Sequence, residues 1–199
     1  MAVNLQKGQK VDLTKGNTGL NKLMIGLGWD EADTPSKGFF GMLFGGTQDI
    51  DCDASVFLLT NGKLANNNDI VYFGNLAHHS GAIQHQGDDL TGAGIGDCEQ
   101  IMIALDKLPA KCDKLVFVVN IYNAVPRNQH FGMVNNAFMR VVDSQNGQEL
   151  LRYDLSENYD QMTAMIFGEV YRHEGEWKFS AIGQPTKDPS LRELANRYL

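Results

Sequence analysis

The chain is poor in cysteine, carries no long apolar run and has no excess of basic residues, and each absence excludes a class of protein. Its three cysteines, Cys52, Cys98 and Cys112, form no C-x-x-C pair, which predicts free thiols in a reducing compartment. No stretch approaches the roughly 18 apolar residues of a membrane span. The opening residues MAVNLQKGQK lack the apolar segment of a signal peptide. We therefore expect a cytoplasmic protein without direct membrane insertion.

Basic residues are outnumbered, with 17 Lys and Arg against 24 Asp and Glu, and the net charge is −7. Non-specific binding to nucleic acid needs clustered Lys and Arg, so no nucleic-acid partner is expected. The 199 residues are 43% hydrophobic, as in soluble globular proteins. A chain of this length buries roughly 70% of its unfolded surface, so it needs no disulfide or metal merely to form a core.

Short apolar runs separated by turn signals predict an all-β fold, a sandwich or a barrel, rather than alternating strands and helices. Asn146-Gly147 and Glu174-Gly175 lie where tight hairpins would close, because Gly and Asn tolerate a positive φ. The nearly continuous apolar run at 114–122 predicts a central strand covered on both faces. The predicted strands lie at 22–29, 54–59, 69–73, 99–105, 114–122, 137–143, 149–155, 164–173 and 176–183.

Two further segments stand out from this pattern. At the C-terminus, Asp188 is a candidate N-cap and Pro189 suits the first position of a short amphipathic helix. The apolar segment GFFGMLFGG at 38–46 is too short for a bilayer and too rich in glycine for a regular strand. It fits either a loop packed on the core or an exposed patch for a partner.

The acidic residues are concentrated, since 10 of the 24 lie in the segments 30–53 and 88–99, which together hold a single base, Lys37. In an extended strand, Asp49, Asp51 and Asp53 share one face, and the apolar residues between them share the other. Carboxylates spaced about 6 to 7 Å apart on one face repel each other unless a cation compensates them. A hard cation such as Ca²⁺, which takes six to eight oxygen ligands, satisfies this requirement.

The second acidic segment, G-D-D-L-T-G-A-G-I-G-D-C-E, combines carboxylates with glycines that allow tight turns and expose backbone carbonyls. It is not an EF-hand, because in a register that starts at Asp88 position 3 of the loop, which must supply a ligand, is Leu90. It is not a dinucleotide or P-loop motif either, because the glycine spacing differs and no Lys follows.

Motifs of the common hydrolases are missing: there is no G-x-S-x-G and no H-E-x-x-H. The pair His78-His79 lies in a loop flanked by Ser and Gly, and we expect it to be solvated. No candidate base or nucleophile stands apart from the acidic clusters, so the sequence favours a binding protein over an enzyme.

Nine motifs along the chain resemble the TerD-like family of tellurium-resistance and general stress proteins. They cover roughly residues 1–184, nearly the whole chain. They are L-x-K-G at 5–8, G-L-G-W-D at 26–30, D-x-D-A-S-x-F-L-L at 51–59, N-L at 75–76, H-x-G-D-D-L-T-G-A-G-x-G-D at 85–97, F-V-V-x-I-Y-x-A at 117–124, F-G-x-V at 131–134, R-Y-D-L at 152–155 and G-E-x-Y-R-H-x-G-E-W-K-F at 168–179.

The resemblance implies a two-sheet β-sandwich domain at 1–184, followed by a C-terminal helical extension at 185–199. It also implies a non-catalytic, cytoplasmic stress-response role, in which Ca²⁺ orders the acidic loops for a protein partner in a stress-response complex. The metal ligands that it implies are Asp30, Asp51, Asp53, Asn75, Asp88, Asp89, Asp97 and Glu99.

This chain departs from the family pattern in its acidic loop and in the apolar insertion at 38–46. Asp89 replaces a common Asn, whereas Ile95 and Cys98 replace common Asp residues, which predicts fewer or weaker ions. Two other readings stay open at this point: a calcium-assisted binder of a small nucleotide-type ligand, and a metal-dependent hydrolase.

Overall fold

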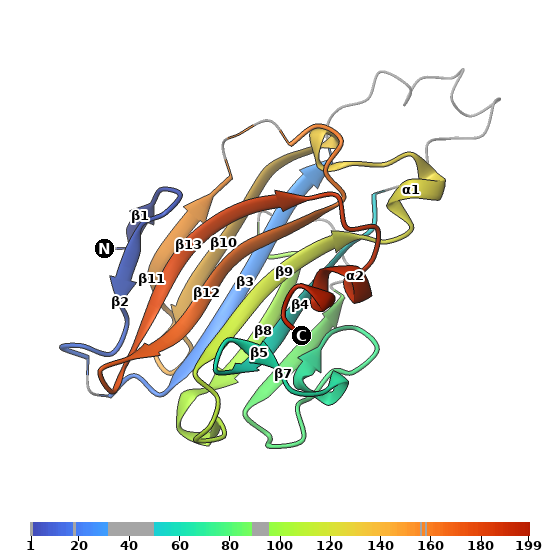
Figure 1. Cartoon of the computed structure of the whole chain (residues 1–199). Coiled ribbons are helices and arrows are strands. Elements are labelled where there is room, and N and C mark those ends of the chain that lie inside the picture. Colours follow the sequence, from blue (N-terminus) through green and yellow to red (C-terminus); the bar gives the residue numbers. More distant parts are fainter. Residues whose placement is uncertain (1, 18, 32–49, 89–95, 156, 158) are drawn as a thin grey trace.

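The computed structural model describes residues 2–17, 19–31, 50–88, 96–155, 157 and 159–199. Over these residues the chain folds into two stacked β-sheets with short helices at their margins (Figure 1). The predicted all-β sandwich is therefore confirmed. Both the apolar segment 38–46 and Asp49 lie outside the described residues. No helix in the described part of the chain has the length and apolarity that a bilayer crossing requires.

The first sheet has six strands, of which β1 pairs with β11 in parallel and the others pair antiparallel. Its edge strand β7 is followed across the sheet by β8, β3, β10, β11 and β1. Their bounds are β1 (Val3–Leu5), β3 (Lys22–Glu31), β7 (Ile83–Asp88), β8 (Glu99–Ala104), β10 (Val134–Asp143) and β11 (Gln148–Asp154).

The second sheet follows the order β2-β13-β12-β9-β4-β5, and the short strand β6 also pairs with β4. Its described pairings are antiparallel. Their bounds are β2 (Lys10–Asp12), β4 (Cys52–Thr60), β5 (Lys63–Leu64), β6 (Ile70–Val71), β9 (Lys114–Ile121), β12 (Ala164–His173) and β13 (Glu176–Thr186).

The main core lies between the sheets, and a second cluster covers the outer face of the second sheet. Strand β9 serves both: Phe117 and Val119 point into the main core, whereas Val116 and Val118 pack in the second cluster. The apolar run at 114–122 predicted burial on both faces of this strand, and the structure confirms it. Strand β4 alternates in the same way, so Cys52, Ala54, Val56 and Leu58 face the main core.

The C-terminal helix α2 (Leu191–Asn196) lies over the second sheet (Figure 1), and its Leu194 and Ala195 side chains belong to that second cluster. Its N-cap is Ser190, not Asp188 as predicted, because the Ser190 side chain accepts from the backbone N–H of Glu193. The Tyr198 carbonyl accepts from the backbone N–H of Leu64 in β5, so the C-terminal segment is tied to the second sheet. The remaining helical turns are α1 (Ala124–Arg127), η2 (Asn67–Asp69), η3 (Leu105–Lys107) and η4 (Phe131–Met133).

All nine predicted runs fall on strands, although the run at 69–73 shrinks to Ile70–Val71. Glu174 and Gly175 both adopt a positive φ, of 55° and 84°, in the tight turn between β12 and β13. Strands β1, β2, β5 and β7 went unpredicted because they are short or carry mostly polar side chains.

A substitution in α2 tests whether this helix contributes to the stability of the folded domain. Leu194 is fully buried against the second sheet. Leu194→Ala is expected to cost about 2–5 kcal/mol, through lost transfer energy and a cavity. Its Tm in thermal unfolding should therefore fall by several degrees, since a domain of this size shifts about 2–4 °C per kcal/mol. Arg192→Ala, on the exposed face of the same helix, is the matched control. Equal Tm values for the two variants would show that α2 is not docked.

Candidate functional site

Acidic side chains from both sheets gather at one end of the sandwich. Asp88 ends β7 and lies opposite Glu99 at the start of β8, and Leu27 of β3 is the partner of Glu99 on its other side. From the second sheet, β4 begins beside them, because the backbone N–H of Ala54 donates to Glu99 Oε2 at 2.6 Å. The strand ends that carry the two acidic segments of the sequence are therefore brought together here.

The thiols of Cys52 and Cys98 lie near these carboxylates, and their pKa values are shifted. The pKa of Cys52 is raised well above its usual value, first by burial and then by the negative charges of Asp53, Glu99 and Asp51. The pKa of Cys98 is also raised, by burial and by nearby carboxylates that include Glu99. The thiolate forms are disfavoured at neutral pH, so neither cysteine is suited to act as a nucleophile. All three cysteines are unpaired, as predicted.

Glu99 and His85 together bind the backbone of β4 at Ala54. While Glu99 Oε2 accepts from the Ala54 N–H, His85 Nε2 lies 3.2 Å from the Ala54 carbonyl oxygen and donates to it. The same Nε2 atom lies 3.4 Å from Glu99 Oε2. His85 Nδ1 accepts from the Gly87 N–H at 3.0 Å, which fixes the proton on Nε2. Both side chains are buried, so they link the first sheet to the second in a setting with little water.

Asp97 has an ion-pair partner that is distant in the sequence. Arg140, from β10, donates from Nε to Asp97 Oδ1 at 2.7 Å and from Nη2 to Oδ2 at 2.8 Å. The Asp97 side chain is fully buried, and it lies directly over Gly26, where any side chain would collide with it. This contact raises the pKa of the Arg140 guanidinium. Both carboxylate oxygens of Asp97 thus already have a cationic partner.

The other predicted ligands occupy different settings. Asp51 is exposed and Asp53 is buried at the start of β4. Asp30 accepts from Asn136 Nδ2 at 2.8 Å, and Asn75 donates to the Ile70 carbonyl at 2.7 Å within its own turn. Asp89 and the side chain of Asp88 lie outside the described residues. Among the residues described, the predicted acids do not supply three ligand atoms close enough to share one ion.

Sequence reasoning missed two residues at this end, His85 and Arg140. His85 belongs to the H-x-G-D-D motif, so its place next to the acidic loop was a usable signal. Arg140 lies 43 residues from its partner Asp97. No local pattern marks it, because the pairing depends on β10 lying beside β3 in the sheet.

The expectation that His78 is solvated is wrong. Its side chain is 1% exposed and its Nε2 atom lies 3.3 Å from Asp69 Oδ1. Burial is the main cause of a lowered pKa, so the ring is neutral at neutral pH. The backbone around His78 is fixed, because its N–H donates to the Ile83 carbonyl at 3.0 Å and its carbonyl accepts from the Gly81 N–H at 2.9 Å, and the ring lies between Asp69 and Ser80. His79 is exposed, as predicted.

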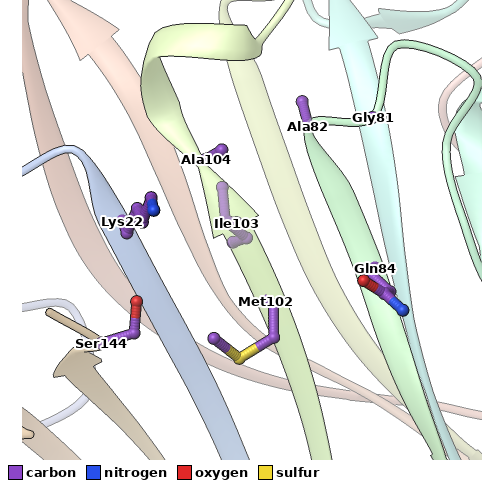
Figure 2. Close-up of a pocket in the computed structure, with 8 residues that line it drawn as sticks. All are labelled: Lys22, Gly81, Ala82, Gln84, Met102, Ile103, Ala104 and Ser144. Carbon is purple, nitrogen blue, oxygen red and sulfur yellow. The ribbon is translucent and has the colours of Figure 1, made fainter.

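Two cavities lie away from the acidic end. One is a hollow of about 160 Å³ on the first sheet. In Figure 2, Lys22 of β3 and Gln84 of β7 flank Met102 of β8 at this hollow. A wider groove of about 680 Å³ runs between α2 and the segment 64–72. Neither lining includes a carboxylate, so neither is a site for a hard cation.

The Arg140–Asp97 pair can be tested against a neighbouring surface pair. Arg140→Gln leaves a buried carboxylate without its cation, and it should lower the free energy of unfolding by about 1–3 kcal/mol. Arg152, its cross-strand neighbour, pairs with the exposed Asp154, so Arg152→Gln should cost less than about 1 kcal/mol. The measurement is urea denaturation, and adding Asp97→Asn should recover part of the loss in Arg140→Gln. If the two Arg variants are equally stable, the buried pair is not structural.

Comparison with known proteins agrees with this architecture. The model of the TerD domain matches residues 1–198. The stress response protein SCP2 of Bacillus subtilis (strain 168) is 54% identical over 199 residues, which is 100% of both chains. The tellurium resistance protein TerD of Serratia marcescens is 45% identical over 185 residues, which cover 92% of this chain and 91% of the relative. A crystal structure of a protein of unknown function aligns with a TM-score of 0.68 over 89% of this chain and 95% of that chain, at 22% identity, a likeness in fold alone. This chain therefore belongs to the TerD family of stress-response and tellurium-resistance proteins.

Proposed function

We propose that this protein is a calcium-binding module of the stress response, whose ion orders the acidic end of the sandwich. The observation that carries the proposal is that the ends of β4, β7 and β8, which bear Asp53, Asp88 and Glu99, lie side by side at one end of the sandwich. Asp51, Asp53 and Asp88 would hold the ion, together with Asp89 from the segment outside the described residues, and Glu99, whose Oε2 atom accepts from the Ala54 N–H, would contribute through its other oxygen. When bound, the cation would supply the positive charge that offsets their mutual repulsion.

The donor set favours calcium over other biological cations. The predicted ligands are oxygen atoms only, which suits a hard cation and not a soft one. The ligands sit on the ends of several strands, and Ca²⁺ accepts six to eight ligands in flexible geometry. Mg²⁺ demands an octahedral arrangement at shorter distances and keeps several waters, so it is the weaker fit.

Asp30, Asn75 and Asp97 are lesser members of this proposed ligand set. Each already has a hydrogen-bond or ion-pair role in the fold, and Asp97 would have to leave Arg140 to bind an ion. The structure therefore supports assigning these three residues to the framework of the site, with the ion held by the acids of β4, β7 and β8.

We further propose a non-catalytic, cytoplasmic role in which the ordered acidic end is a surface for a protein partner. Thiols with raised pKa values make poor nucleophiles, which supports binding over catalysis. The names of the relatives, a stress response protein and a tellurium resistance protein, support the cellular setting.

Calcium should raise the thermal stability of the protein, and magnesium should do so much less. A ligand that binds only the folded state stabilises it by about 2.7 kcal/mol at a hundredfold excess over Kd. The measurement is Tm at matched concentrations of the two ions, with calorimetry for stoichiometry. Equal shifts from both ions would contradict the proposed selectivity.

Asp53→Asn should weaken calcium binding while leaving the ion-free fold intact or slightly more stable. The charges of Asp51 and Glu99 act on the same spot as that of Asp53, so removing one charge relieves repulsion. Asp106→Asn, an exposed acid beyond the opposite end of β8, is the control and should bind calcium like the wild type. If calcium-free Asp53→Asn unfolds while the calcium-free wild type is folded, Asp53 is a structural residue and not a ligand.

A further inference from the structure

A second cluster of metal-ligating side chains lies at the other end of β7, away from the acidic loops. Asp69, His78 and His79 each offer one ligand atom, and these three atoms lie within 4.8 Å of one another. Asp69 ends the η2 turn that precedes β6, whereas the two histidines lie in the turn that leads into β7. We propose that these three residues form a site for a borderline divalent transition ion such as Zn²⁺.

The distances suit zinc coordination. Zinc binds imidazole nitrogen and carboxylate oxygen at about 2.0–2.2 Å in tetrahedral geometry, so neighbouring ligand atoms lie about 3.3–3.5 Å apart. The distance from His78 Nε2 to Asp69 Oδ1 is 3.3 Å, which is one edge of such a tetrahedron. The rings of His78 and His79 lie 4.1 Å apart between centroids, so the second imidazole needs only a side-chain adjustment to complete the set.

Outer partners already hold two of the three ligands in place. Asp69 Oδ2 accepts from Asn66 Nδ2 at 2.9 Å, which turns Oδ1 toward His78. His78 Nδ1 lies 2.7 Å from Ser80 Oγ, and the Ser80 hydroxyl can either donate to this nitrogen or accept from it. The Ser80 backbone N–H donates to the same Nδ1 atom at 3.2 Å, so a metal that takes the place of the proton on Nε2 would move that proton to Nδ1, which would then donate to Ser80 Oγ and give up the Ser80 N–H contact. Such outer-shell contacts are typical of metal-binding histidines.

Two of the three proposed ligands are buried, and the third is exposed to solvent. The side chains of His78 and Asp69 are 1% and 10% exposed, so these ligands are shielded from water. His79 is exposed, which gives an ion a route from solvent, and a water would take the fourth position of a tetrahedral ion. The titratable groups that act on His78 are Asp69, His79 and Lys111.

Imidazole ligands separate this site chemically from the calcium site proposed above. Calcium prefers oxygen donors, whereas two nitrogens and one oxygen favour zinc and its neighbours. A bound ion would tie η2, which precedes a strand of the second sheet, to the turn that begins a strand of the first sheet. The ion would thus link the two sheets at this edge of the sandwich.

The test is calorimetric titration of Zn²⁺ into the full chain at neutral pH, with calcium present in excess to occupy the acidic loops. The wild type should bind one zinc ion per chain. His79→Ala should weaken binding about tenfold or more, and because this side chain is exposed the variant should fold normally. His173→Ala, another exposed histidine, is the matched control and should leave zinc affinity unchanged.

Cobalt substitution identifies the ligands independently of affinity. Co²⁺ in the wild type should show the visible absorption of tetrahedral nitrogen and oxygen coordination, without the thiolate charge-transfer band that cysteine ligands would add. Asp53→Asn should leave both zinc and cobalt binding unchanged, which separates this site from the calcium proposal. Zinc binding that His79→Ala leaves intact, a thiolate band, or no saturable zinc binding would each overturn the assignment.

Discussion

The sandwich is held together at its acidic end by a buried side-chain pair that takes the place of a strand. Among the described residues, Ala54 of β4 has a strand partner only on the side of β9. On the other side, Glu99 accepts from its N–H and His85 donates to its carbonyl. A buried peptide group without such partners would cost free energy comparable to a lost hydrogen bond, so β4 depends on this pair.

This constraint also explains why the acids of the two segments come together. Glu99 is fixed to β4 by its Oε2 atom, so the strand that begins with Cys52 and Asp53 must lie beside the start of β8. Asp88 follows because β7 pairs with β8 there. The concentration of negative charge is therefore a consequence of how the sheets are joined, and a bound cation would relieve a repulsion that the fold itself creates.

The acidic side chains of this fold occupy three settings. Asp97 is neutralised within the chain by the two-pronged contact with Arg140, and Gly26 makes room for it. The acids of β4, β7 and β8 are the ones for which we propose an external ion. Around Asp69, a neutral imidazole takes the place of a cation, and a transition metal can bind its Nε2 atom once the ring proton has moved to Nδ1.

The sequence by itself determined the fold class, the central strand at 114–122 and the hairpin at Glu174-Gly175, because alternation, two-sided apolarity and turn residues act locally. It also marked the two acidic segments and the motifs that define the family. Only the tertiary structure decided which acids have partners and that His78 is buried beside Asp69, because those contacts join residues from different strands and turns. Long-range pairing sets these outcomes, and no local pattern encodes it.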